Sequence, residues 1–410
     1  MKINKYTLEN GLQIVHLEDK STQMVTLNIL YKVGSRNEDE EHTGFAHLFE
    51  HLMFGGSKNI PDYDTPLQYA CGENNAYTTS DYTNYYLTVP AANVETGFWL
   101  ESDRMNCLAF TPESLEVQRK VVMEEFKQHY ITPPYGDLMH LISDLAYKVH
   151  PYRWPTIGLK LDHIANVKME EVKDFFFRYY APNNAILSVV GNITMDEVVR
   201  LSEKWFGGIE RREIDSTPIP QEPEQTKMRR KTVKKGVPND VLFMAFPVVG
   251  EGHEDFYCSD MISDILSVGR SCRLRRHLVM DRHLFTSIDA FVHGRMDGSQ
   301  LMICGMPAEG VSIEEAEKAV WEELDDLCKN GISDDELEKV KNKYETNYSR
   351  ECADRQKLAA KLAYFEMMGG AELAGKQIER YRSTTKEHFM TVCREVVKRE
   401  KCSVLYYLKK

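Results

Sequence analysis

The sequence predicts an α+β fold of two homologous domains, each a mostly antiparallel sheet packed with helices. The chain has 410 residues, which suits two or three domains at about 150 residues each. Its composition, 42% hydrophobic and 28% charged, is typical of a folded chain rather than a disordered or coiled-coil one. Strand-like alternation and helical stretches of about 10 to 20 residues are mixed in both halves, which indicates the α+β class.

Short runs that alternate apolar and polar residues predict the strands. The segment 1–19 alternates in this way. Further strands are expected at 25–33, 77–89 and 184–190, and then at 241–248, 287–293 and 301–304. Helices are expected where a Ser or Thr is followed by acidic residues, as at Thr111 and Ser333, because these side chains cap the first turn.

The two helix starts indicate an internal repeat. At a constant offset of 222 residues, Thr111 matches Ser333 and Leu115 matches Leu337. In both halves a strand and a helical stretch precede the match. The two halves therefore look like divergent copies of one unit.

A segment rich in proline and charge separates the copies. We expect a first domain at 1–210, a linker at 211–238 and a second domain at 239–410. The basic run Lys227–Lys235 could contact nucleic acid. Because no aromatic residues interleave with it, a solvated strand entering the second domain is the favoured interpretation.

Charge and cysteine content narrow the class of protein. The net charge of -12 argues against a nucleic-acid partner. The nine cysteines are scattered and contain no CxxC pair, as expected for reduced thiols in a cytosol. No signal-peptide pattern and no long apolar run occurs, so we expect a soluble cytoplasmic protein with no membrane partner, or a periplasmic one if an export signal was removed.

The stretch TGFAHLFEHLMFGG, from Thr43 to Gly56, carries the chemistry. Thr43 can cap a helix here, and Gly55 and Gly56 can end it. Such a helix is apolar nearly all round and therefore expected to be buried. Its polar side chains, His47, Glu50 and His51, lie at i, i+3 and i+4 and share one face.

Buried imidazoles and a buried carboxylate need partners. One interpretation is a hydrogen-bonded core network. The more specific interpretation is a zinc site, because two histidines four residues apart on a helix can direct two nitrogens at an ion about 2.0 to 2.1 Å away. Glu50 would then act on a water at the metal rather than bind the metal, which is the HxxEH order of inverted zincins. A third ligand must come from elsewhere, and the helix 113–130 offers Glu124 and Glu125.

HLFEH followed 74 residues later by a glutamate resembles the pitrilysin and insulinase-like zinc metallopeptidases, which include the mitochondrial processing peptidases. The resemblance covers most of the chain. It implies that Glu125 is the third ligand and that one Zn²⁺ binds per chain. Gln118 stands where the family often has a glutamate that supports a metal-binding histidine without binding the metal itself. In this chain the Gln118 amide would provide that support, or the support would be weaker.

The resemblance extends to a strand. NNAYTTSDYTNYYLTVP resembles the substrate-binding strand of the family, which implies that Asn75, Ala76, Tyr77 and Thr78 pair with a peptide substrate. Strand addition to a sheet edge gives affinity through main-chain hydrogen bonds and tolerates many sequences. An ordinary amphipathic strand is the alternative.

The second half departs from the family pattern. At the 222 offset Glu125 falls on Asn347, and 258–269 has no histidine pair, so we expect no zinc site there. Family members carry an arginine and, seven residues on, a tyrosine that hold the scissile peptide. The matching residues here are Val279 and Thr286. Because split family members keep the two motifs in different subunits, we expect a heterodimer with a homologous subunit that carries the Arg/Tyr pair. A homodimer is the other possibility.

These observations predict a zinc metalloendopeptidase that cleaves extended peptides in a chamber formed with a second subunit or domain. His47, His51 and Glu125 bind zinc, and Glu50 moves the proton. One alternative is a non-catalytic structural subunit of a processing complex that retains the metal motif. A metal-dependent hydrolase of a non-peptide substrate is a third, weaker one.

Overall fold

The computed structural model describes residues 2–214 and 217–410, which form two compact units. The first unit comprises 1–128, 154–219 and 348–377, and the second comprises 129–153, 220–347 and 378–410. Each unit thus includes a segment from the other half of the sequence. The domain boundaries expected at 210 and 239 stay a prediction, and the interval 211–238 contains a strand of the second sheet, β7 (Arg229–Lys235).

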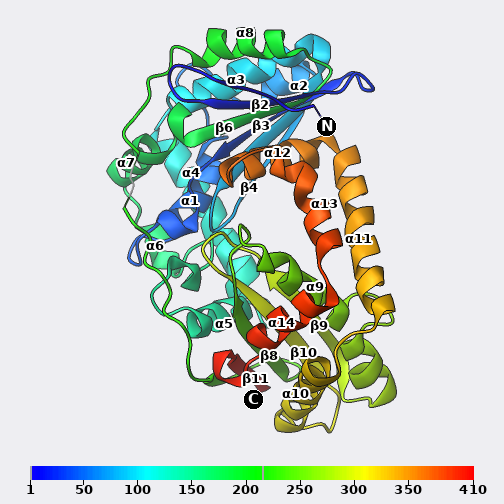
Figure 1. The fold of residues 1–410 in the computed structure, drawn as a ribbon. Helices are drawn as coiled ribbons and strands as arrows, with labels where there is room; N and C mark the ends of the chain where they lie inside the picture. Colours follow the sequence, from blue (N-terminus) through cyan, green and yellow to red (C-terminus); the bar gives the residue numbers. More distant parts are fainter. Residues whose placement is uncertain (1, 215–216) are drawn as a thin grey trace. The chain divides into compact units, whose positions relative to one another are not determined.

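The first unit is built on a six-stranded sheet in the order β1-β2-β6-β3-β5-β4 (Figure 1). Its strands are β1 (Asn4–Thr7), β2 (Gln13–Glu18), β3 (Met24–Tyr31), β4 (Glu73–Thr78), β5 (Thr83–Pro90) and β6 (Ala185–Gly191). Its helices include α1 (Phe45–Leu52), α2 (Asp64–Tyr69), α3 (Val94–Asn106), α4 (Pro112–Phe126), α6 (Leu161–Ala165), α7 (Met169–Tyr179), α8 (Met195–Phe206) and α12 (Arg355–Met367). All pairs are antiparallel except β2 with β6.

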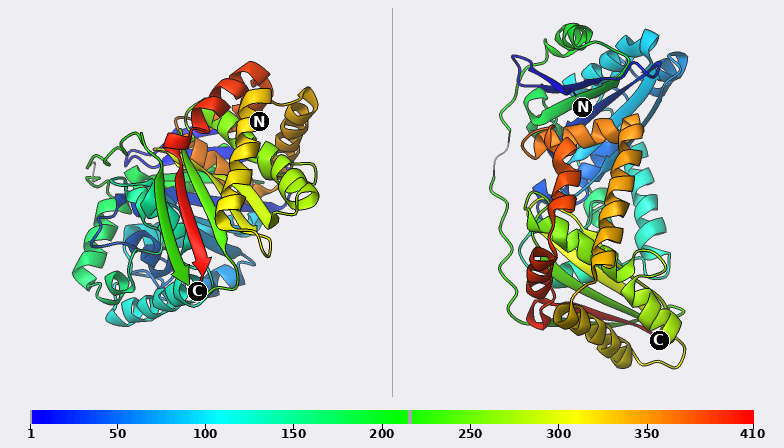
Figure 2. Two further views of the ribbon diagram at one scale, coloured as in Figure 1. Left: turned by 90° about the horizontal axis from the view of Figure 1, so that it is seen from below. Right: turned by 45° about the vertical axis from the view of Figure 1, so that its right-hand side comes forward.

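The second unit is built on a five-stranded sheet in the order β7-β11-β8-β10-β9. Its other strands are β8 (Val241–Val248), β9 (Phe285–His293), β10 (Ser299–Pro307) and β11 (Ser403–Lys409). Its helices include α5 (Leu138–Ala146), α9 (Asp255–Ser267), Leu274–Asp281, α10 (Ile313–Asn330) and α14 (Lys386–Val396), while α11 (Asp334–Ala353) and α13 (Leu373–Ser383) have residues in both units. Figure 2 shows the red strand β11 flanked by the green strands β7 and β8, with which it pairs in parallel and antiparallel fashion respectively.

The two sheets confirm the expected fold class and repeat one topology. The first half has the chain order β2-β3-α1-α2-β4-β5-α3-α4. The second half has the matching order β7-β8-α9, the helix Leu274–Asp281, and then β9-β10-α10-α11. β6 and β11 then close each sheet in the same place, as the partners of β2 and β7. The caps expected at the matched helices are also present. Thr111 accepts a hydrogen bond from the Ser114 N–H, and Ser333 accepts one from the Glu336 N–H.

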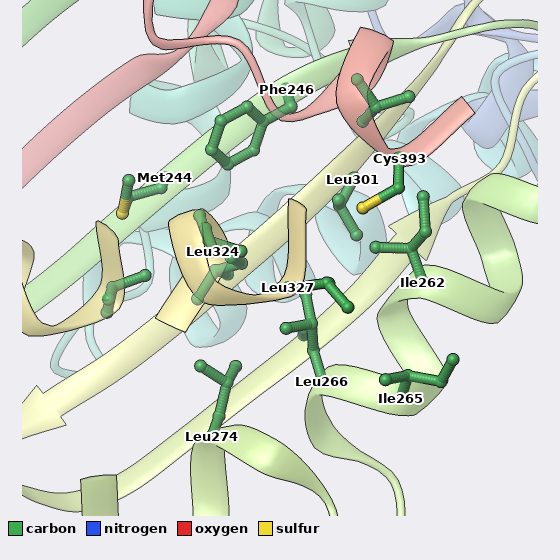
Figure 3. Close-up of a cluster of buried hydrophobic side chains, with 14 of the residues drawn as sticks. Met244, Phe246, Ile262, Ile265, Leu266, Leu274, Leu301, Leu324, Leu327 and Cys393 are labelled. Carbon is green, nitrogen blue, oxygen red and sulfur yellow. The ribbon is translucent and has the colours of Figure 1, made fainter. Parts of the chain in front are cut away.

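Side chains alternate between the two faces of each sheet, so the apolar ones pack against helices on both faces. In the first sheet, Leu30 packs with α12, whereas Leu27 approaches α3 at Gly97. In the second sheet, Met244 and Phe246 join the core of α9, α10 and α14, part of which is drawn in Figure 3. The alternate residue Phe243 packs against α5 instead. A helix from the distant part of the chain therefore covers one face in each unit.

Most expected strands are confirmed within two residues, but two expectations are wrong. The segment 1–19 forms two strands, β1 and β2, separated by residues 8–12. The interval 77–89 is not one strand, because residues 79–82 form a tight turn between β4 and β5. The Thr79 hydroxyl makes this turn without glycine, since it donates to the Tyr82 carbonyl and accepts from the N–H groups of Asp81 and Tyr82.

Three further observations concern the basic run, the cysteines and the membrane. Residues 229–235 form a strand whose side chains are exposed or half-buried, as expected for the basic run. All nine cysteines are free thiols in the structure. Within the described ranges, no helix combines the length and apolar character needed to cross a bilayer.

Candidate metal centre

Helix α1 carries the predicted motif and is buried as expected. Phe45, Ala46, Leu48, Phe49 and Leu52 are all buried. One side of the helix packs through aromatic contacts. The Phe49 ring stacks on the rings of Phe175 and Tyr180 at centroid distances of 5.1 and 5.0 Å. These contacts fix the rotation of α1 about its axis, so His47, Glu50 and His51 are held on its remaining face.

The expected cap of α1 is wrong. The helix begins after Gly44, whose φ of +92° suits glycine and whose added Cβ would lie 2.6 Å from the Ile157 carbonyl oxygen. Thr43 instead accepts from the Leu159 N–H. The first-turn N–H groups of Gly44 and Ala46 donate to the two carboxylate oxygens of Glu38 at 2.9 and 2.8 Å. The Glu38 side chain, which lies outside the helix, thus replaces the N-cap side chain as the hydrogen-bond acceptor.

Glu38 was not predicted from the sequence. Burial raises the pKa of the Glu38 carboxyl to about 8. The hydrogen bonds from the backbone N–H groups of Ala46 and Gly44 act in the opposite direction, because they favour the charged form. Its position six residues before Gly44 gave no capping signal, because the usual pattern places the acceptor at the N-cap itself. The loop that folds back from Glu38 supplies the contact.

The structure brings His47, His51 and Glu125 together. Glu125, on α4, places Oε2 3.7 Å from His47 Nε2 and 3.3 Å from His51 Nε2. One ligand atom from each residue lies within 4.8 Å of the others, and this is the group of possible metal ligands found among the described residues. All three side chains are partly exposed, at 16%, 20% and 33%, so an ion can reach them.

The spacing of these three atoms fits zinc. Two ligands about 2.0 to 2.1 Å from a tetrahedral ion are separated by roughly 3.4 Å, which is close to the two distances to Glu125 Oε2. Two imidazoles and one carboxylate also form a donor set that zinc takes in catalytic sites with one position left open. Glu124 points elsewhere, since its carboxylate is 61% exposed and pairs with Lys127.

Glu50 lies beside the three donors but outside their group. Its Oε2 accepts a hydrogen bond from the Thr78 hydroxyl at 2.6 Å. Burial raises the pKa of Glu50, while the Thr78 hydrogen bond and the nearby His51 act in the opposite direction. The carboxyl is therefore held apart from the ligand atoms by a bond to β4.

The predicted substrate strand is β4, an edge strand of the first sheet. Its exposure alternates along the strand, with Asn75 and Tyr77 exposed and Ala76 and Thr78 half-buried. β4 contacts α1, so the half-buried set lies on the side of the motif. The structure therefore places Asn75 and Tyr77 on one side of the strand and Thr78 on the other.

The other predicted residues lie on α4, on the helix Leu274–Asp281 and on β9. Gln118 is half-buried on α4, seven residues and thus two turns before Glu125, on the same helix face. Val279 packs against the core of the second unit, and its carbonyl lies 3.2 Å from His283 Nδ1. Thr286 is exposed on β9 and donates to the Met306 carbonyl. The roles assigned to these residues stay predictions.

The chain combines two matching α+β sheets with two histidines and two glutamates that lie close together on helices α1 and α4. These features are typical of candidate metallohydrolases. Comparison with known proteins then specifies the family. Residues 13–157 match the family described as insulinase, peptidase family M16, and residues 166–344 match the M16 peptidase inactive domain.

Relatives with similar sequences are named as zinc proteases. The chain is 33% identical over 349 residues to the zinc protease PqqE of Helicobacter pylori, covering 83% of this chain and 78% of that protein. It is 27% identical over 342 residues to the uncharacterized zinc protease YmxG of Bacillus subtilis, covering 83% and 82%. The chain belongs to the insulinase family of peptidases, M16.

Solved structures agree with the fold. A crystal structure of a protease from Helicobacter pylori superposes with a TM-score of 0.92 at 28% identity, covering 99% of each chain. The M16 peptidase inactive domain from Pseudomonas fluorescens has a TM-score of 0.87 at 15% identity, covering 100% of this chain and 98% of that one. At that identity the second likeness bears on the fold alone.

Proposed function

We propose that this chain is a zinc-dependent endopeptidase that binds one Zn²⁺ through His47, His51 and Glu125. The observation that carries the proposal is the triangle of ligand atoms around Glu125 Oε2, with the Glu50 carboxyl beside it. The names of the relatives as zinc proteases support the choice of metal and reaction.

The chemistry divides between the ion and Glu50. When bound, zinc lowers the pKa of a water to about 7 and polarises the peptide carbonyl. Glu50 is the proton carrier: its carboxylate accepts the proton of the attacking water and returns it to the leaving amine. Its Oε2 accepts the hydrogen bond from Thr78, which favours Oε1 as the atom that takes the proton.

The substrate class is an extended peptide. β4 is an edge strand with exposed side chains at Asn75 and Tyr77, so a peptide can add to its outer side through main-chain hydrogen bonds. This mode selects extended, unstructured segments over folded proteins and tolerates varied sequences. Asn75, Ala76, Tyr77 and Thr78 form the binding strand.

The active species is a heterodimer with a homologous subunit, in this proposal. Val279 has no side-chain donor, and the Thr286 hydroxyl is already bonded to Met306, so neither supplies the contacts that arginine and tyrosine would make to the scissile peptide. Losing preorganised donors of this kind typically costs about 100 to 1000-fold in rate. A subunit carrying the Arg/Tyr pair would complete the peptide-binding chamber, and a homodimer would leave it without these donors.

One observation favours a second candidate function. Residues 166–344 match a domain described as inactive, and Val279 and Thr286 lack the expected groups. A structural subunit that binds zinc without cleaving peptides has the same features. The two functions differ in one measurable property, namely whether turnover depends on Glu50.

The test combines metal analysis with a peptidase assay on the purified chain, alone and with its native partner. We expect about one zinc per chain, activity that a chelator removes and zinc restores, and a Glu50→Gln variant that keeps its zinc but loses turnover. Glu113→Gln, an exposed change on α4, is the control. Loss of zinc from Glu50→Gln would make Glu50 a ligand. A zinc-loaded complex without turnover would establish the structural alternative.

A further inference from the structure

We infer that Thr78 is a positioning residue for Glu50: its hydroxyl sets the direction of the Glu50 carboxyl, in addition to the backbone role proposed for its strand. The inference rests on the proposed function, because it concerns the orientation of the proposed proton carrier. The observation is the 2.6 Å hydrogen bond from Thr78 Oγ1 to Glu50 Oε2, which joins the edge strand to the motif helix.

The bond restricts a side chain that would otherwise rotate. A glutamate has three side-chain torsions, and the last of these swings the two carboxylate oxygens with little preference. Threonine is stiff at χ1 because it is branched at Cβ, so a hydroxyl anchored in a strand is a fixed donor. With Oε2 held by Thr78, the direction of Oε1 is also set.

Thr78 itself is held in place by the turn that follows it. It is the last residue of β4 and pairs with Thr83 across the hairpin. The Thr79 hydroxyl closes the turn, and the carbonyls of Thr79 and Ser80 accept hydrogen bonds from the N–H groups of Ser35 and Arg36. Gly34 allows this approach, since an added Cβ would lie 2.5 Å from the Ser80 carbonyl oxygen. The end of β4 is thus fixed by main-chain contacts.

The same strand is the proposed site of peptide addition. Side chains alternate along β4, so the substrate pairs with the backbone of a strand whose last side chain reaches Glu50. Peptide binding to the strand and alignment of the proton carrier therefore use one rigid element. This arrangement predicts that Thr78 affects the chemical step more than the affinity for the peptide.

The test is steady-state kinetics on the full chain with its partner, using one unstructured fluorogenic peptide. Thr78→Val keeps the shape and removes the hydroxyl. We expect kcat to fall about 10 to 100-fold, as for a modest misplacement of a catalytic group, with KM and zinc content unchanged. Thr78→Ser keeps the hydroxyl and should restore kcat to near the wild-type value. Thr7→Val, on the opposite edge strand β1, is the matched control and should have no effect.

Several outcomes would overturn the inference. A wild-type kcat in Thr78→Val would show that the hydroxyl is not needed, and a raised KM with unchanged kcat would make Thr78 a substrate contact. If Thr78→Val does not fold, the comparison moves to Thr78→Ser and Thr78→Ala, where equal kcat values at equal zinc content would overturn it. An inactive wild type would overturn the proposed function as well, whereas an active wild type with an unaffected variant overturns only this inference.

Discussion

Helices α1 and α9 occupy matching places in the two halves, but their polar side chains meet different kinds of partner. Each follows the second matched strand of its half, β3 or β8. α1 faces Glu125 of α4 with two imidazoles. α9 instead carries Asp264, whose carboxylate accepts two hydrogen bonds, at 2.6 and 2.7 Å, from Lys343 of α11, the helix that matches α4.

The difference shows that one topology can place either a set of possible metal ligands or an internal ion pair at matching helices. A buried carboxylate needs a positive charge nearby. In the second unit the Lys343 ammonium supplies that charge from within the chain. In the first unit the groups that meet are electron-pair donors, which can share a cation taken from solution. The proposed zinc site therefore belongs to the helix pair α1 and α4, and the fold common to both halves does not provide it.

The largest expected effect comes from removing the carboxylate that completes the donor set. We expect Glu125→Gln to lower the affinity for zinc by more than about 100-fold, because a neutral amide is a poor zinc ligand. The loss should exceed the one caused by removing a residue that only hydrogen-bonds to a metal ligand. Activity should be lost with the metal. Zinc content after dialysis against a weak chelator measures the effect.

Glu124→Gln is the matched control for this change. It alters the adjacent residue, which is exposed and pairs with Lys127, so zinc content should stay at the wild-type level. If Glu124→Gln loses zinc and Glu125→Gln keeps it, the third ligand is one residue upstream. The comparison between the two units would then rest on the wrong carboxylate.

Local sequence signals predicted the elements that bring the donors together. The apolar helix with His47 and His51 and the capped helix with Glu125 follow from periodicity and caps, and both are present. Glu38 and the turn after Thr78 were not predicted, because each depends on a side chain that replaces a more usual signal, an N-cap residue or a glycine. Local patterns also carry no information on which sheet a helix will cover, so the placement of α12 in the first unit was not predicted.

A smaller effect is expected from breaking the internal ion pair of the second unit. The Asp264 side chain is 6% exposed, and Lys343→Met leaves it without its ammonium partner. We expect a loss of about 2 kcal/mol in the free energy of unfolding, below the range for fully buried pairs because Lys343 is 33% exposed. Chemical denaturation of the chain measures the loss, while zinc content should not change.

The double variant Asp264→Asn with Lys343→Met sharpens this test. Removing both charges leaves no uncompensated ion, so much of the lost stability should return. A double variant less stable than Lys343→Met alone would show that Asp264 is held by something other than the ammonium. In that case the contrast between an internal cation and a metal would fail.

The last expected effect concerns the start of the matched helices; it is of similar size at pH 7 and becomes smaller at lower pH. Burial opposes ionisation of Glu336, but hydrogen bonds from Arg273 and Ser333 outweigh it and lower the pKa of this carboxyl to about 2, from 4.5. A lowered pKa in the folded state stabilises the protein above pH 4.5, and this contribution is lost as the pH falls towards 2. We expect Glu336→Gln to lower the free energy of unfolding by about 2 kcal/mol at pH 7, after allowing for a side chain that is 25% exposed, and by progressively less below pH 4.5.

Ser114 is the control for this prediction. It occupies the matching position of α4 at the 222 offset and carries no charge, so any loss of stability in Ser114→Ala should not vary with pH. Urea unfolding of both variants at pH 7, 4 and 3 gives the comparison, and a Glu336→Gln cost that stays constant over this range would contradict the assigned pKa.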